Sequence, residues 1–259
     1  MSQNQPKRNI LEEFFNSRNI VVVTGAGISA ESGLPTFRDK DGYWTKGSKN
    51  YHPMELATRQ TFATEPETVW EWYHYRRNLY AKTNPNEGHK ALTDLERFFN
   101  ANERKFHLVT QNVDNLHGKA GSKRENMFEI HGNIFFMRCF EECSGELYEI
   151  KEETTGVPVC PKCEANMRPH VLWMDEFYDE EYYKFRSVLD LGDKMDALML
   201  VGTTLQTNLP RKLFELSYYK QLPTIEINPE PIGLKKYGVL ELQGKSGELL
   251  PEIVKKVSV

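Results

Sequence analysis

Residues 19–33 read NIVVVTGAGISAESG, and this stretch decides the fold. Its first half runs from Ile20 to Thr24 with β-branched residues only, which predicts a strand that is apolar on both faces. Such strands lie at the centre of parallel sheets, because helices cover both sides of the sheet. The second half contains Gly25, Gly27 and Gly33 and predicts a tight turn that leads into a helix. The stretch therefore predicts the centre of a parallel α/β sheet.

Strand-like and helix-like segments alternate along the rest of the chain. Apolar runs at residues 106–110, 197–201 and 224–228 have the length of strands. Residues 88–99 carry apolar side chains at helical spacing. This alternation predicts an α/β fold with a doubly wound parallel sheet.

Two segments interrupt the alternation and predict a second, smaller unit. Residues 37–85 are rich in aromatic side chains and mostly helical in pattern, and residues 137–170 carry all the cysteines. We expect these two segments to form a small module beside the sheet. The large domain then consists of residues 1–36, 86–136 and 171–259.

The glycines after the first strand resemble a dinucleotide-binding turn, in which small residues let the backbone approach a pyrophosphate. The interval from Gly27 to Gly33 is longer than in the Gly-x-Gly-x-x-Gly pattern, so the turn alone fits a nucleotide site and a plain tight turn equally well. Small or polar residues also follow three other strand-like runs, in the segments 110–114, 202–204 and 228–230. Ligands in open α/β sheets bind at the carboxyl ends of strands, so these segments favour the nucleotide.

The four cysteines form two close pairs, Cys139-x3-Cys143 and Cys160-x2-Cys163. Two facing pairs of this kind match a tetrahedral zinc site with four thiolate ligands. Two disulfides are the alternative, but residues 1–10 lack the apolar segment of an export signal to an oxidising compartment. Four protein ligands leave zinc no position for water, so we expect one structural ion per chain.

Composition argues against several other classes of protein. The 259 residues include 33 Lys and Arg against 37 Asp and Glu, a net charge of −4. This balance disfavours direct nucleic-acid binding, which needs a basic surface. The mean hydropathy is −0.61, and no run approaches the ~18 apolar residues of a membrane span. We therefore expect a cytoplasmic protein with no membrane partner.

Several motifs occur in one order along the chain. They are GAGISAESGLPTFRD at 25–39, TQNVDNLH at 110–117, IHG at 130–132, the paired cysteines, RPHVLW at 168–173, GTT at 202–204 and IN at 227–228. This ordered set resembles the signature of the sirtuins, the NAD-dependent protein-lysine deacylases, over nearly the whole chain. The resemblance implies a Rossmann-like large domain, a small module of helices and zinc, and NAD as co-substrate in the cleft between them.

The resemblance also implies roles for individual residues. His131 matches the general base, and Asn112 and Asp114 match residues that orient the nicotinamide ribose. On the residues alone, His131 would be read as an ordinary structural histidine. Phe37 and Arg38 match a loop that keeps water from the reacting ribose carbon. The implied contacts with NAD are Gly25, Ala26, Gly27, Ser29, Ala30, Thr36, Phe37, Arg38, Gln111, Asn112, Asp114, Gly202, Thr203, Thr204, Asn228 and Ser246.

A second set of residues is expected to determine which acyl group is removed. Residues 69–76 and Thr36 resemble the class III branch of the sirtuins, whose members remove succinyl, malonyl and glutaryl groups. In that branch a Tyr-x-x-Arg pair binds the acyl carboxylate and a small residue widens the tunnel, which here implies Tyr73, Arg76 and Ala57. On periodicity alone, the aromatic residues would be core and Arg76 would be a surface charge.

The substrate is expected to be an acylated-lysine protein or peptide, and the products nicotinamide and 2′-O-acyl-ADP-ribose. The implied peptide contacts include Val171, Met174 and Asp175. Met174 and Asp175 stand where the family usually has Phe-Gly, so Asp175 is expected either to repel an acidic acyl-lysine context or to favour basic peptides.

Two other functions compete with lysine deacylation. The same NAD cleft could serve protein ADP-ribosyl transfer or NAD hydrolysis, in which His131 would matter less. The chain could also be a non-catalytic interaction protein that binds NAD and zinc. The joint presence of Asn112, Asp114 and His131 argues against that reading, because a protein that only binds NAD needs no base.

Overall fold

The computed structural model describes residues 8–35, 44–46 and 49–257. Its larger part contains a six-stranded sheet in the order β11-β10-β9-β1-β4-β5, and every neighbouring pair is parallel. The strands are β1 Asn19–Thr24, β4 Lys105–Thr110, β5 Met127–Glu129, β9 Ala197–Val201, β10 Thr224–Asn228 and β11 Leu240–Gln243. The predicted α/β fold with a parallel sheet is confirmed. The edge strand β11 was not predicted, because its short segment Leu-Glu-Leu-Gln carries no β-branched run.

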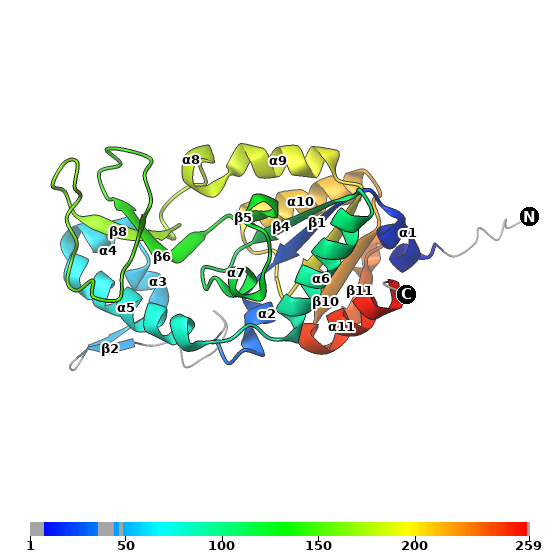
Figure 1. Ribbon diagram of the computed structural model, residues 1–259, viewed down its shortest axis with the longest axis horizontal. Helices are drawn as coiled ribbons and strands as arrows, with labels where there is room; N and C mark the ends of the chain where they lie inside the picture. Colours follow the sequence, from blue (N-terminus) through cyan, green and yellow to red (C-terminus); the bar gives the residue numbers. More distant parts are fainter. Residues whose placement is uncertain (1–7, 36–43, 47–48, 258–259) are drawn as a thin grey trace, which may run out of the picture.

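Strand β1 lies inside the sheet, between β4 and β9, and its apolar side chains are fully buried. Ile20 and Val22 enter one apolar cluster and Val21 and Val23 enter another, because successive side chains of a strand point to opposite faces. Helices cover both faces of the sheet (Figure 1). On the first face they are α1 Ile10–Asn16, α6 Glu87–Ala101 and α11 Ser246–Val257, and on the second face α9 Phe185–Lys194 and α10 Asn208–Tyr219.

The smaller part of the molecule lies beside the sheet, at the left of Figure 1. It contains a three-stranded antiparallel sheet in the order β7-β6-β8. Its elements are β2 Trp44–Lys46, β3 Lys49–Tyr51, α3 Pro53–Leu56, α4 Arg59–Thr64, α5 Pro66–Lys82, β6 Gly132–Cys139, β7 Tyr148–Glu149 and β8 Met167–Val171. The aromatic side chains of α5, including Trp70, Trp72 and Tyr73, form its core together with Trp173. The residues 37–85 and 137–170 thus supply most of its elements.

The remaining helical segments are short. They are α2 Ala26–Ala30, α7 Leu116–Ala120, α8 Glu180–Tyr183 and the single 3₁₀ turns η1 Arg124–Asn126 and η2 Lys235–Tyr237. Helices α2 and α7 follow β1 and β4 and lie between the large sheet and the smaller part (Figure 1). Within the described part of the chain, every helix is too short or too polar to cross a bilayer.

Candidate active site

The carboxyl ends of four parallel strands meet at one edge of the large sheet. Backbone hydrogen bonds continue past the strands: Gly25 N donates to Val201 O (3.0 Å), Gln111 N to Thr24 O (3.0 Å) and Gly202 N to Ile227 O (3.0 Å). Three of the four turns that the sequence singled out, those after β1, β4 and β9, are therefore adjacent, and the turn after β9 is also bonded to the end of β10. This edge of an open α/β sheet is where ligands bind.

Two glycines let the turns after β1 and β9 touch through their backbones. Gly27 N donates to Gly202 O at 2.9 Å. A Cβ atom on Gly27 would lie 2.7 Å from the Cα of Gly202, and one on Gly202 would lie 2.4 Å from Ile28 N. Gly202 also has a φ of +59°, which favours glycine. Both glycines are therefore required by the fold, because a side chain on either would collide with the backbone of the other turn.

Three polar side chains meet beside this turn, all of them buried. The Ser29 hydroxyl donates to Asp114 Oδ2 at 2.7 Å, and Asn112 Nδ2 donates to Ser29 Oγ and to Gly25 O, both at 3.1 Å. Burial raises the pKa of Asp114, and the backbone N–H of Leu116 opposes that rise. The structure thus brings together Ser29 from one segment and Asn112 and Asp114 from another, two segments that the sequence placed in one site.

Two buried histidines lie behind this cluster, and the residues alone suggested only structural roles for them. His89 Nε2 lies 3.4 Å from Ser29 Oγ, and the ring of His89 lies 4.8 Å from that of His117. His117 Nε2 lies 2.9 Å from Thr24 Oγ1. Burial lowers the pKa of His89 to about 4 and that of His117 well below its usual value, so both rings are neutral near pH 7. No sequence pattern marks His89, since only its position in space connects it with Ser29.

His131 follows β5 and lies at the rim of the same edge. Its Nδ1 lies 2.9 Å from the carbonyl oxygen of Gln111, and its Nε2 lies 2.7 Å from the Tyr178 hydroxyl. A carbonyl only accepts hydrogen bonds, so Nδ1 carries the proton and the lone pair of the neutral ring lies at Nε2. Burial lowers the pKa of His131 to about 4. The ring is therefore neutral near pH 7 and able to accept a proton at Nε2.

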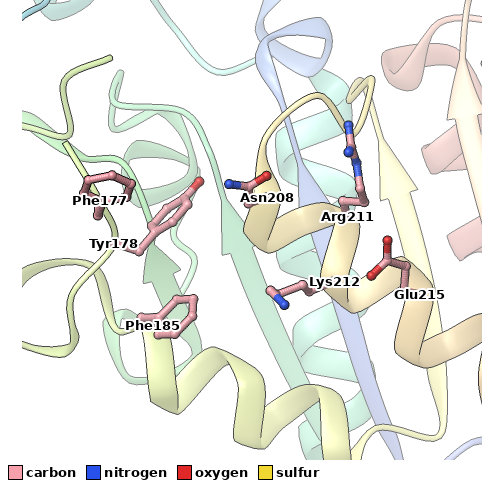
Figure 2. Close-up of a pocket in the computed structure, with 7 residues that line it drawn as sticks. All are labelled: Phe177, Tyr178, Phe185, Asn208, Arg211, Lys212 and Glu215. Carbon is pink, nitrogen blue, oxygen red and sulfur yellow. The ribbon is translucent and has the colours of Figure 1, made fainter. Parts of the chain in front are cut away.

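Tyr178 was not identified from the sequence. Its ring stacks on His131 at 5.8 Å and on Phe185 at 6.2 Å, and its hydroxyl donates to the lone pair of His131 Nε2. Tyr178 also lines a cavity of about 380 Å³. Figure 2 shows Phe177, Tyr178 and Phe185 on one side of this cavity and Asn208, Arg211, Lys212 and Glu215 of α10 on the other.

Hydrogen bonds fix the positions of several of the remaining predicted NAD contacts. Gln111 Nε2 donates to Thr203 Oγ1 at 2.8 Å, and Asn228 Nδ2 donates to Thr203 O at 3.0 Å. Ser246, at the start of α11, donates to Glu31 Oε1 at 3.0 Å, which places it next to the end of α2. Ala26 and Ala30 lie in α2, and Thr204 follows β9. The predicted contacts Thr36, Phe37 and Arg38 lie outside the described residues.

The predicted acyl-binding residues lie in the core of the smaller part. Ala57, Tyr73 and Trp173 belong to one buried cluster, and Trp173 Nε1 donates to the Tyr73 hydroxyl at 2.9 Å. Burial raises the pKa of Tyr73, so its hydroxyl keeps its proton. The guanidinium of Arg76 lies over the Trp72 ring at 4.9 Å. Arg76 is therefore not the solvated surface charge that periodicity alone would predict.

The segment after β8 is fixed by hydrogen bonds to the smaller part. Met174 N donates to Ala57 O at 2.9 Å, and Arg168 donates to Glu176 through both Nη1 and Nη2. The carboxylate of Asp175 accepts from Arg59 N at 2.7 Å and from Gln60 N at 3.1 Å, at the first turn of α4. Met174 is half exposed, whereas Val171 is buried. An aspartate in place of the usual glycine therefore serves as a cap of α4.

Replacing Asp175 with alanine is expected to lower the free energy of unfolding by about 1–2 kcal/mol, the usual cost of losing a helix-capping carboxylate. Chemical denaturation followed by circular dichroism measures this change. The variant Glu252→Ala, which removes an exposed carboxylate from α11, is the control for loss of charge. Equal stability of the two variants would show that Asp175 does not stabilise α4.

The four cysteines converge at one end of the three-stranded sheet. All four are free, and their Sγ atoms lie within 4.8 Å of one another. Cys139 and Cys163 are 3.5 Å apart and Cys143 and Cys160 are 3.6 Å apart, whereas a disulfide needs about 2.05 Å. Tetrahedral zinc with Zn–S bonds of about 2.3 Å separates its sulfurs by about 3.8 Å. The cluster fits a structural zinc ion, as predicted, and the paired disulfides are excluded.

Comparisons with known proteins agree with this geometry. The sequence model of the Sir2 family matches residues 25–208. An NAD-dependent protein deacylase of Leptospira interrogans serogroup Icterohaemorrhagiae serovar Lai is 43% identical over 93% of each chain. One of Aquifex aeolicus is 40% identical over 91% of this chain and 93% of its own. The crystal structure of a Sir2 homologue with NAD superposes with a TM-score of 0.84 at 33% identity, covering 98% of this chain and 94% of that one.

Proposed function

This chain belongs to the Sir2 family of NAD-dependent protein deacylases, and from this premise we propose that it removes succinyl and malonyl groups from lysine side chains of proteins or peptides. Nicotinamide and 2′-O-acyl-ADP-ribose are the products. A mutant Sir2 homologue has been solved with 2′-O-acetyl ADP-ribose, and that structure superposes with a TM-score of 0.84 at 34% identity. The reaction class follows from the family, whereas the acyl preference rests on residues of this chain.

The edge of the large sheet fits NAD in shape and in polarity. Gly27 and Gly202 let the turns after β1 and β9 pack against each other at the strand ends, where a dinucleotide-binding turn receives its phosphate groups. The buried Asn112 and Asp114 present polar atoms that orient a ribose and a carboxamide. NAD would supply, at C1′ of its nicotinamide ribose, an electrophile toward the acyl oxygen of the substrate, with nicotinamide as the leaving group. The nearby lone pair of His131 Nε2 is the proton acceptor of the site.

Using that lone pair requires a change at Tyr178. The Tyr178 hydroxyl now donates to Nε2, so a ribose hydroxyl reaches the base only by taking the place of the phenol. Nδ1 stays bound to the carbonyl of Gln111, which keeps the ring in its orientation and tautomer. His131 then accepts the hydroxyl proton as a neutral ring.

The acyl preference is carried by one observation, the placement of Tyr73 and Arg76 on one face of α5 amid buried aromatic rings. These residues are three positions apart, so their side chains are neighbours on the helix. Tyr73 is 2% exposed, and the Arg76 guanidinium lies over Trp72. A guanidinium among aromatic rings binds a carboxylate strongly, because little water competes for it. Succinyl and malonyl groups end in such a carboxylate, and an acetyl group does not.

Replacing Arg76 with methionine is expected to lower kcat/KM for a succinyl-lysine peptide by well over tenfold, since truncating one partner of a buried charge pair costs ~2–5 kcal/mol. Activity on the acetyl-lysine peptide of the same sequence should be unchanged or higher, because methionine makes the surroundings more apolar. Both rates are measured as 2′-O-acyl-ADP-ribose formed, by liquid chromatography and mass spectrometry.

Arg97→Met is the control, because Arg97 forms an exposed ion pair with Asp94 on α6 and lies outside the predicted site. A wild-type protein that prefers acetyl-lysine, or an equal loss on both peptides in Arg76→Met, would refute the acyl preference. Formation of free ADP-ribose without peptide consumption would instead indicate NAD hydrolysis.

A further inference from the structure

Tyr80 lies on α5 one helical turn after Arg76 and is only 5% exposed. Its hydroxyl oxygen accepts from Arg76 Nε at 3.1 Å and also from Arg76 Nη2. The guanidinium carbon of Arg76 lies 5.3 Å from the centre of the Tyr80 ring and 4.9 Å from that of Trp72. One phenol oxygen and two aromatic rings therefore set the direction in which Arg76 points.

The last turn of α5, which carries Tyr80, is itself held in place. The ammonium group of Lys119, in α7, donates to the carbonyl oxygens of Tyr80 (2.8 Å), Ala81 (2.8 Å) and Thr83 (3.0 Å). A cation at the carboxyl end of a helix satisfies carbonyl groups that have no partner within the helix. Tyr80 is thus fixed by its backbone as well as by burial of its ring.

The hydroxyl groups of Tyr73 and Tyr80 each carry a proton that they can donate in a hydrogen bond. The hydroxyl oxygen of Tyr80 accepts from Arg76, and that of Tyr73 accepts from Trp173 Nε1. No hydrogen bond donated by either hydroxyl occurs among the residues that the structure describes. Each phenol has one proton to donate, so the hydroxyls of Tyr73 and Tyr80 form a pair of donors that calls for an acceptor. A carboxylate, which only accepts, is the matching ligand.

We propose that Tyr80 is a third residue of the acyl-carboxylate site, which holds the Arg76 guanidinium in position and donates its own hydroxyl proton to the acyl carboxylate. This inference rests on the proposed preference for succinyl and malonyl groups. It predicts that acyl selectivity depends on the Tyr80 oxygen and not only on the Tyr-x-x-Arg pair.

The variant Tyr80→Phe tests this role, because it keeps the ring and removes only the oxygen. The KM for a succinyl-lysine peptide should rise about tenfold, the lower end of what a hydrogen bond to a charged group contributes. The kcat for the succinyl-lysine peptide should change less than about twofold. The kcat and the KM for the acetyl-lysine peptide should also change less than about twofold, because none of these quantities depends on the carboxylate contact. Tyr75→Phe is the matched control, because Tyr75 neighbours Arg76 in sequence but is 59% exposed.

A double variant separates positioning from general support of the helix. In the Arg76→Met background, Tyr80→Phe should weaken the use of succinyl-lysine by less than in the wild-type background, because the guanidinium that Tyr80 positions is already gone and only the hydrogen bond from Tyr80 to the carboxylate can still be lost. The inference is overturned if Tyr80→Phe lowers activity on acetyl-lysine as much as activity on succinyl-lysine. It is also overturned if the effects of Tyr80→Phe and Arg76→Met on succinyl-lysine activity simply add in the double variant. If Tyr80→Phe does not fold, Tyr80→Met at the same position provides the comparison between the two peptides.

The same assays distinguish failure of this inference from failure of the proposed acyl preference. If Arg76→Met loses succinyl-lysine activity selectively while Tyr80→Phe behaves as wild type, only the role of Tyr80 is refuted. If the wild type already prefers acetyl-lysine, the proposed preference itself fails, and the role of Tyr80 fails with it.

Discussion

Replacing His131 with alanine is expected to lower the deacylation rate by at least about 10²-fold, the usual contribution of a general base. The reason lies in the hydrogen bonds of the ring. Gln111 O holds the proton on Nδ1, so Nε2 is the only position of this side chain that accepts a proton, and burial keeps the ring neutral near pH 7. Alanine removes that lone pair, and no other histidine lies against Tyr178 among the described residues.

NAD binding should persist in His131→Ala, because the glycine turn and the Ser29, Asn112 and Asp114 cluster do not depend on the imidazole. Isothermal titration with NAD measures this, and a steady-state assay with the preferred acyl peptide measures turnover. An unchanged thermal unfolding midpoint shows that the loss is not one of folding. Undiminished turnover would exclude His131 as the base.

Replacing Cys160 with serine is expected to release zinc and to unfold much of the smaller part of the molecule. Structural zinc contributes roughly 10–16 kcal/mol of apparent binding free energy in small zinc-binding peptides, which is comparable with the whole stability of an ordinary domain. The Sγ atoms of the four cysteines gather the end of β6 and the segment before β8, so a bound zinc ion would hold together the connection between these two neighbouring strands. Zinc content by mass spectrometry and thermal unfolding by calorimetry report the two effects.

Lys162→Ala is the control for the zinc prediction, because Lys162 lies between Cys160 and Cys163 with an exposed side chain. It should retain one zinc per chain and unfold at the wild-type temperature. Treatment of the wild type with a chelator should reproduce the Cys160→Ser result. A Cys160→Ser protein with one bound zinc and full stability would contradict the four-cysteine assignment.

The parts of the fold that could be predicted from sequence are those specified by local patterns. The run Ile20 to Thr24 forms β1, and the helical spacing of Leu92, Leu95 and Phe99 forms α6, because in both cases a continuous pattern matches one buried face. The zinc site could also be predicted from the two cysteine pairs, because the short spacing within each pair is typical of metal ligands whatever lies between the pairs. The strand β11 has only four residues and no such pattern.

The partners of individual side chains could not be predicted, because they come from distant segments. Asp175 caps a helix more than one hundred residues earlier in the chain, and His89 reaches Ser29 only through the packing of α6. The contact of Tyr178 with His131 depends on how the segment after β8 folds back over β5. Tyr80 is different: its i, i+4 spacing from Arg76 is visible in the sequence, but only a known role for Arg76 would draw attention to it.

The hydrogen bonds of residues 173–176 have a consequence for the cost of substrate binding. Within this segment the backbone N–H groups of Trp173, Met174 and Glu176 already have partners, and the side chain of Asp175 is bound to α4. A segment with so many of its polar groups satisfied has lost its conformational entropy during folding. A peptide bound at the predicted contacts Met174 and Asp175 would therefore bear only its own ordering cost, which lowers the total entropic cost of binding.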